Sequence, residues 1–227
     1  VIRLPRISNF TDIAPLEAVD ELDVSYVSNI SQFGDPDVVI IPGSKNTISD
    51  LLWMRQNGLE GKILRHAAKG GIVCGICGGY QMLGQSISDP TGAEQKGTVR
   101  GMGLLPVTTV FEQEKRRTRV SGRFAKVGGA LAEMSGVCYE GYEIHMGRTV
   151  LSKGTVPLVY MEEEGEQRQD GAQSDHVYGC YMHGIFDMSE TVKTFLAAVL
   201  RKKGIDPSKI TVRDRNAYKE EQYDRLA

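Results

Sequence analysis

The first half of the chain alternates short apolar runs with segments whose apolar residues recur at helical spacing. Runs of strand length occur at residues 23–28, 37–41 and 72–76. Helical spacing occurs at residues 48–55 and 61–69. The run at residues 37–41, Asp-Val-Val-Ile-Ile, is uninterrupted, as expected for a parallel strand that is buried on both faces. This order predicts an α/β fold with right-handed crossovers and a mainly parallel open sheet flanked by helices.

The second half of the chain has a different pattern. From about residue 97 to residue 161, short alternating segments with many glycines and charges predict antiparallel additions at one end of the sheet. Residues 176–182 have the pattern of another buried strand. An amphipathic helix is expected at residues 189–203, with Ser189 as its N-cap. The highly charged segment 213–227 predicts a surface helix.

Composition narrows the classes of protein that the chain can belong to. It has 227 residues without an internal repeat or a convincing linker, so we expect a single domain over residues 1–227. With 27 basic and 29 acidic residues, it lacks the basic excess that indicates nucleic acid or an anionic membrane as a partner. Its apolar runs are too short for a transmembrane helix. Four cysteines and no secretory leader favour a cytoplasmic location.

Cys77 lies where the strand of residues 72–76 runs into a turn and then a helix. Gly75 precedes it by two residues, and Gly78 and Gly79 follow it directly. Small neighbours allow a nucleophile to project from a sharp turn, and the dipole of the following helix favours its thiolate. The amide of Gly78 is suited to holding an oxyanion. Cys77 is therefore a candidate nucleophile, although a buried cysteine beside a glycine turn has the same local pattern.

A metal or redox role for Cys77 together with Cys74 is the weaker hypothesis. Cys74 is expected inside the strand, and the chain has no second paired-cysteine motif to complete a zinc site. We therefore expect no metal.

A cysteine nucleophile needs a base that removes and returns its proton. His183 directly follows the predicted strand of residues 176–182, so we expect it at the same edge of the sheet as Cys77. His66 falls within a predicted helix, and His176 falls at the start of a strand. His145 is the only serious competitor.

A third group normally orients the base and stabilises its charged form. Ile185, two residues beyond His183, cannot do so. Asp187, four residues beyond, and Glu143, near His145, are both open alternatives.

Three features together resemble class I glutamine amidotransferases, whose fold is flavodoxin-like. They are Gly-Ile-Cys-Gly-Gly-Tyr-Gln at residues 75–81, Pro-Gly-Ser at residues 42–44, and the distant His183. In that family the cysteine attacks the side-chain amide of glutamine, ammonia leaves, and water hydrolyses the thioester. The usual family pattern has Glu at the position of Ile185. Its absence resembles the subfamily of cobyric acid and cobyrinic acid a,c-diamide synthases.

Two further stretches sharpen this resemblance. Residues 3–12, Arg-Leu-Pro-Arg-Ile-Ser-Asn-Phe-Thr-Asp, resemble the start of the glutaminase domain in cobyric acid synthases. Residues 141–147, Gly-Tyr-Glu-Ile-His-Met-Gly, resemble a second signature that both synthases share. The resemblance covers residues 1–187.

The resemblance implies a role for each matching residue. Cys77 would be the nucleophile and His183 the acid and base. Oxyanion donors would be Gly78 and the Gly43–Ser44 loop, and Gln81 would hold the substrate glutamine. Alternatively, Gly43 and Ser44 form an ordinary turn and Gln81 lies on the helix surface. Glu143 and His145 have an open role, which includes a packed pair that shapes a domain interface.

The resemblance also implies a biosynthetic setting. Cobyric acid synthases amidate corrin carboxylates in cobalamin biosynthesis with ATP and glutamine, and their N-terminal synthetase domain precedes the glutaminase. The chain begins at Val1 and contains no phosphate-binding Gly-x-x-x-x-Gly-Lys-Ser/Thr loop. We therefore expect a C-terminal fragment without a cofactor of its own, with ATP and Mg²⁺ bound only by the N-terminal domain. Its expected partners are glutamine, that synthetase domain and a corrin substrate.

Two alternatives stay open. One is the glutaminase of a related amidotransferase that acts on a cell-wall precursor or makes cobyrinic acid a,c-diamide. The other is a non-catalytic module with the same fold, which the missing acid at position 185 supports.

Overall fold

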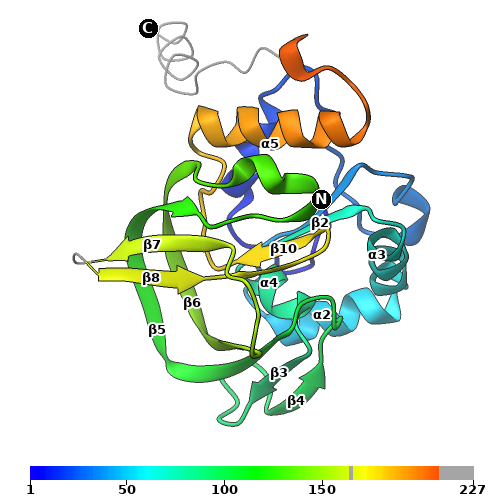
Figure 1. Ribbon diagram of the computed structural model, residues 1–227. Helices are drawn as coiled ribbons and strands as arrows, with labels where there is room; N and C mark the ends of the chain where they lie inside the picture. Colours follow the sequence, from blue (N-terminus) through cyan, green and yellow to red (C-terminus); the bar gives the residue numbers. More distant parts are fainter. Residues whose placement is uncertain (164–165, 210–227) are drawn as a thin grey trace, which may run out of the picture.

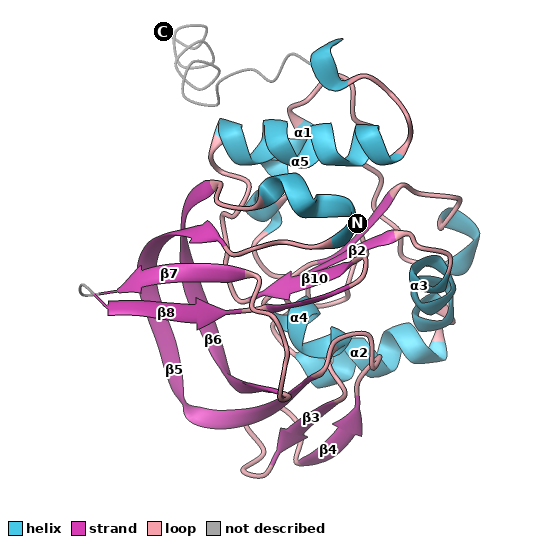
Figure 2. Cartoon of the chain, viewed as in Figure 1, coloured by secondary structure: helices cyan, strands magenta, loops and turns pink. Residues whose placement is uncertain are grey.

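The structure, a computed structural model, describes residues 1–163 and 166–209, without the side chains of residues 113–115 and 209. The helix expected at residues 213–227 lies outside the described residues. Two sheets lie next to each other, and helices cover both faces of the first sheet (Figures 1 and 2).

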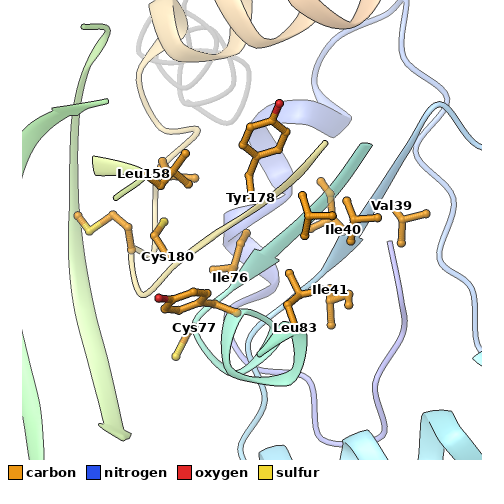
Figure 3. Packing of buried hydrophobic residues seen from close by; sticks show 14 of the residues in the cluster. Val39, Ile40, Ile41, Ile76, Cys77, Leu83, Leu158, Tyr178 and Cys180 are labelled. Atoms are coloured by element: carbon orange, nitrogen blue, oxygen red, sulfur yellow. The ribbon is translucent and has the colours of Figure 1, made fainter. Parts of the chain in front are cut away.

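The first sheet has the strand order β1-β2-β10-β9. Its members are β1 (Val38–Ile41), β2 (Ile72–Ile76), β10 (Val177–Cys180) and β9 (Ala172–Ser174). The first three strands are parallel, and β9 is antiparallel to β10. Their apolar side chains, among them Ile40, Ile76 and Cys180, pack closely together in the core (Figure 3). The predicted strands at residues 37–41, 72–76 and 176–182 are thereby confirmed.

Helices enclose this sheet on both sides (Figure 1). One face carries α2 (Thr47–Gln56), α3 (Leu59–Ala68) and α4 (Gly78–Leu83); the other carries α5 (Ser189–Lys202) and η3 (Gly129–Met134). Shorter helical segments are η1 (Phe10–Asp12), α1 (Ala14–Glu17), η2 (Ile30–Gln32) and η4 (Pro207–Lys209). The α/β fold class is therefore confirmed.

The second sheet supplies the expected antiparallel additions. It contains β3 (Ser86–Asp89), β4 (Gly97–Arg100), β5 (Val107–Phe124), β6 (Cys138–Leu151), β7 (Val159–Glu163) and β8 (Glu166–Asp170). All its pairs are antiparallel except β3 with β5. The long pair β5–β6 shifts register between Phe111 and Arg116. This sheet is larger than the parallel one because β5 and β6 alone contribute 18 and 14 residues.

Two sequence predictions about local structure were wrong. Residues 23–28 form no strand, because only Val27 is bridged, to Ile2, and a single bridge is too short for a ladder. Ser189 is the first residue of α5, and Met188 occupies the N-cap without a capping side chain. Within the described ranges, none of the helices has the length and apolar character needed to cross a membrane.

Candidate active site

Cys77 forms the sharp turn between β2 and α4. Its φ of 50° and ψ of −106° lie in a region that residues with a side chain rarely adopt. Strain of this kind is typical of functional sites, because the surrounding structure must enforce it. The Cys77 amide donates a hydrogen bond to the Cys180 carbonyl (2.9 Å), and the thiol Sγ donates to the Ile144 carbonyl (3.5 Å). The turn is thereby tied to the end of β10 and to the middle of β6, at the edge of the packed core (Figure 3).

The glycines around Cys77 allow α4 to approach the sheet closely. A Cβ atom on Gly79 would lie 2.0 Å from the Ile41 carbonyl oxygen, and one on Gly75 would lie 2.8 Å from the backbone of Gly79. Both contacts are with backbone, which cannot move aside as the end of a flexible side chain can. The glycine pattern recognised in the sequence therefore has a steric cause.

We expect Gly79→Ala to lower the free energy of unfolding by about 2–4 kcal/mol, because it forces α4 away from β1. Urea denaturation followed by circular dichroism measures this loss. The matched control is Gly61→Ala in α3, where an added Cβ meets no atom within 4 Å. Since alanine favours a helix interior over glycine, this control should gain about 0.5–1 kcal/mol. Equal effects of the two substitutions would contradict the steric explanation.

His183 lies at the same edge of the sheet as Cys77. Its backbone pairs with Tyr142 of β6 in both directions, with N···O distances of 2.9 and 3.1 Å, and the two rings stack. Its ring is 1% exposed, and Cys77 is one of the neighbours that raise its pKa. The prediction that β10 delivers a histidine to the nucleophile agrees with this geometry.

Asp12, which the sequence analysis did not single out, lies against the other side of the His183 ring. Its Oδ2 is 2.7 Å from His183 Nδ1, and its Oδ1 accepts a hydrogen bond of 2.9 Å from the Gly184 amide. Nδ1 therefore pairs with Asp12, which leaves Nε2 for Cys77. Asn9 adds a contact, since its Nδ2 lies 3.0 and 3.1 Å from the two ring nitrogens.

Glu143, one of the two carboxylates considered from the sequence, pairs with arginines. Glu143 is fully buried and accepts hydrogen bonds from Arg116 (2.9 Å) and Arg168 (2.5 Å). Asp187 is exposed, whereas Ile185 packs in the core at 6% exposure. The acid that faces His183 thus comes from the beginning of the chain.

The surroundings of His183 favour its charged form. Burial alone would lower its pKa, but the hydrogen bond with Asp12 and the interaction with Cys77 outweigh burial and raise the pKa to about 10. At neutral pH the ring is therefore a cation that lies between Asp12 and Cys77.

The loop after β1 lies beside the first turn of α4. A Cβ atom on Gly78 would lie 2.9 Å from the Ser44 amide nitrogen, and one on Gly43 would lie 3.1 Å from His183 Cε1. The Ser44 hydroxyl donates to Asp50 (2.6 Å) and accepts from the Asn46 amide. Any oxyanion contact from Ser44 would therefore come from its backbone.

Comparison with known proteins gives the family. The sequence profile of the CobB/CobQ-like glutamine amidotransferase domain matches residues 1–191. The chain belongs to this family. A cobyric acid synthase of Ruminiclostridium cellulolyticum is 52% identical over 231 residues, which cover 100% of this chain and 45% of that protein. One of Lachnoclostridium phytofermentans is 44% identical, covering 100% of this chain and 46% of that protein. The amidotransferase domain thus spans less than half the length of these relatives.

Solved structures support the fold. PurLQS from Thermotoga maritima has a TM-score of 0.64 at 17% identity, over 89% of this chain and 96% of that chain. A glutamine amidotransferase from the same organism has a TM-score of 0.52 at 16% identity, over 98% of this chain and 90% of that chain. The predicted class I glutamine amidotransferase fold is confirmed, and membership of the amidotransferase family indicates an enzyme.

Gln81 is buried in the amidotransferase domain, so the alternative that it lies on the helix surface was wrong. Its Oε1 accepts a hydrogen bond from Thr47 (3.3 Å), and its Nε2 donates to the Tyr181 hydroxyl (3.1 Å). Gly147 lies against it, since a Cβ there would be 2.4 Å from Gln81 Nε2. The predicted contact with substrate glutamine stays a prediction.

The second sequence signature of the amidotransferase domain, residues 141–147, lies in β6. Tyr142 bonds the backbone of His183, and the Ile144 carbonyl accepts from Cys77. The His145 ring stacks on Tyr181 at 3.7 Å between centroids. The backbone of this signature therefore contacts both Cys77 and His183. Its His145 side chain contacts Tyr181, which is bonded to Gln81.

Cys74 does not pair with Cys77 in the amidotransferase domain. Burial raises the pKa of the Cys74 thiol to about 12, so this partly buried residue, packed against the core, is unreactive. In the part of the chain that the structure describes, no three His, Cys, Asp or Glu side chains group as metal ligands would.

Proposed function

We propose that this domain hydrolyses glutamine to glutamate and supplies the ammonia for an ATP-dependent amidation of corrin carboxylates. The observation that carries the proposal is the position of the His183 ring, which is hydrogen-bonded to Asp12 and lies close enough to Cys77 for the two side chains to interact. A buried nucleophile, base and carboxylate in this order have the geometry of a catalytic triad.

In the first half-reaction, the Cys77 thiolate attacks Cδ of the glutamine side chain. A carbon–sulfur bond forms, and the carbonyl oxygen becomes an oxyanion that the Gly78 amide and the Gly43–Ser44 loop stabilise. The His183 imidazolium then gives its proton to the amide nitrogen. The carbon–nitrogen bond breaks, ammonia leaves, and a glutamyl thioester remains on Cys77.

In the second half-reaction, neutral His183 takes a proton from water, whose oxygen attacks the thioester carbon. The carbon–sulfur bond breaks, the thiolate returns to its ion pair with His183, and glutamate leaves. Asp12 stabilises the imidazolium in both halves and holds the ring so that Nε2 faces Cys77. Gln81 helps to hold the substrate at the start of α4.

The biosynthetic setting rests on the relatives. Both compared cobyric acid synthases match the whole chain with less than half of their own length. We propose that the domain is the C-terminal part of such a synthase. Its N-terminal synthetase domain would bind ATP, Mg²⁺ and the corrin, and would use the ammonia in cobalamin biosynthesis in the cytoplasm.

Labelling with a chloroketone analogue of glutamine tests the glutaminase function. We expect one adduct, at Cys77, and protection by added glutamine, because only Cys77 combines a partner histidine with a substrate site. Cys138 is the internal control, since it is exposed and lacks such surroundings. Mass spectrometry of the digested protein locates the adduct. Equal labelling of Cys77 and Cys138, or labelling that glutamine does not slow, would favour a non-catalytic module.

A further inference from the structure

A buried carboxylate lies beside the loop that follows β1. Asp50 belongs to the first turn of α2, and its side chain is 0% exposed. The chemistry proposed for Cys77 and His183 does not use this group. Burial of a carboxylate costs free energy unless hydrogen bonds compensate for it, so the partners of Asp50 show which part of the fold it holds in place.

Asp50 accepts hydrogen bonds from two other segments of the chain. Its Oδ2 accepts from the Ser44 hydroxyl (2.6 Å) and from the Arg6 amide (3.2 Å). Its Oδ1 lies 3.3 Å from Nη1 of Arg6, whose side chain is half exposed. The Ser44 hydroxyl also accepts a hydrogen bond of 3.0 Å from the Asn46 amide. Asp50 therefore ties the loop after β1 to the N-terminal segment and to the start of α2.

The backbone amide of Ser44 faces the helix that follows Cys77. Residues 6–8 and 43–45 form an antiparallel bridge centred on Ile7 and Ser44, and the flanking residues make its hydrogen bonds of 2.9 and 2.8 Å. In such a pair the central residues direct their own N–H and C=O groups away from the partner segment. The Ser44 nitrogen lies instead next to α4, since a Cβ atom on Gly78 would be 2.9 Å from it. This position suits a second oxyanion donor beside the Gly78 amide.

The N-terminal segment that Asp50 holds continues to the candidate base. Asn9 follows the bridge in a left-handed turn with a φ of 53°, and Asp12 then reaches His183 Nδ1 at 2.7 Å. Asp50 thus anchors the near end of a segment whose far end orients the histidine.

We propose that Asp50 is a positioning residue, which holds the Ser44 amide in place as an oxyanion donor for the reaction at Cys77. This role rests on the proposed function, because the oxyanion arises when the thiolate attacks a carbonyl carbon. The helix α2 already has Asn46 as its N-cap, so it does not need Asp50 for capping. A hydrogen bond to a carboxylate is roughly twice as strong as one between neutral groups, so it fixes the loop before the substrate binds. A donor fixed in advance needs no reorganisation when the negative charge develops.

The γ-aldehyde analogue of glutamine tests this role, because the Cys77 thiol adds to it without a leaving group. A carbon–sulfur bond forms, the thiol proton passes to the aldehyde oxygen, and that oxygen of the tetrahedral adduct occupies the oxyanion site. For Asp50→Asn we expect the inhibition constant of the aldehyde to rise about 10–100-fold and kcat to fall by a similar factor. The KM for glutamine should stay within about threefold of wild type. The alkaline limb of kcat, which reports His183, should not move, and this separates an oxyanion effect from an effect on the base.

Glu60→Gln is the matched control. Glu60 is a buried carboxylate that pairs with Arg55 at 2.6 and 2.8 Å between α2 and α3. Its substitution should lower stability, as that of Asp50 does, but should leave the inhibition constant of the aldehyde unchanged. Equal effects of the two substitutions on that constant would overturn the positioning role.

Ser44→Ala removes the hydroxyl that Asp50 accepts but keeps the backbone amide, so its loss of aldehyde affinity should resemble that of Asp50→Asn. Because both substitutions break the same hydrogen bond, the double variant should lie within about threefold of the weaker single variant. Losses that multiply would contradict the proposal. Should Asp50→Asn fail to fold, Ser44→Ala alone decides, and unchanged aldehyde affinity in it would refute the role of Asp50. Glutamate release by the wild-type protein tests the proposed function separately.

Discussion

Cys77→Ala is expected to reduce glutamate release from glutamine by at least about 10⁴-fold, down to the rate without a nucleophile. No other group can replace the thiolate in forming a thioester. The nearest hydroxyl identified in the loop after β1, that of Ser44, already donates to Asp50. A coupled assay for glutamate, with the protein at high concentration, measures the residual rate.

The control for this substitution is Cys180→Ala, which removes a buried thiol from the end of β10. Burial raises the pKa of the Cys180 thiol well above its usual value, so this sulfur is not a nucleophile. The Cys180→Ala variant should keep glutaminase activity within about threefold of wild type, while its free energy of unfolding falls by roughly 1 kcal/mol. A Cys77→Ala protein that retains a tenth of wild-type activity would refute the nucleophile assignment.

The parallel part of the fold could be predicted because its sequence signals are local and strong. Val38–Ile41 and Ile72–Ile76 are apolar strands, and the helix between Leu59 and Ala68 has the expected helical periodicity of apolar residues. The segment 23–28 misled because its alternation matches a strand, whereas only Val27 has a bridge partner. Strand formation there depends on whether a neighbouring segment can pair with these residues, and the periodicity of the segment itself does not show this.

The candidate site could be predicted in part for a similar reason. Carboxyl ends of parallel strands share an edge, so Cys77 and His183 could be placed together across 106 positions of sequence. Asp12 could not, because it lies in a 3-10 helix that no strand rule positions. Its approach to His183 follows from the left-handed turn at Asn9 and from the pairing of Ile7 with Ser44. The only signal was the family-like stretch at residues 3–12, whose likeness assigned no role to its last residue.

The absence of an acid at position 185 is no argument against catalysis, because Asp12 supplies a carboxylate to His183. The catalytic histidine requires an anion at Nδ1. A carboxylate two residues after the histidine can meet this requirement, and so can a carboxylate from a distant segment of the chain. Ile185 is packed in the core at 6% exposure, where an unpaired carboxylate would be costly. The departure from the usual family pattern is therefore compatible with catalysis. Because the carboxylate comes from Asp12, activity depends on the folding of residues 9–12.

Asp12→Asn is expected to lower kcat by roughly 10²–10⁴-fold, because an amide neither stabilises imidazolium nor fixes the tautomer with Nε2 towards Cys77. The variant should still fold, since the asparagine oxygen can accept the hydrogen bond from the Gly184 amide. Steady-state kinetics at saturating glutamine separates this effect from weaker substrate binding. A loss confined to KM would contradict the assigned role.

The pH dependence of the same variant has a defined sign. With the pKa of His183 raised to about 10, the imidazolium persists through neutral pH, and activity should fall only as the pH rises through that value. Removing the Asp12 charge lowers this pKa, so the alkaline limb of kcat should move to lower pH by about 1–3 units. Asp187→Asn, an exposed carboxylate four residues beyond His183, is the matched control and should leave the limb in place. Because loss of packing alone would reduce activity equally at all pH values, a shifted limb identifies Asp12 as the group that keeps His183 charged.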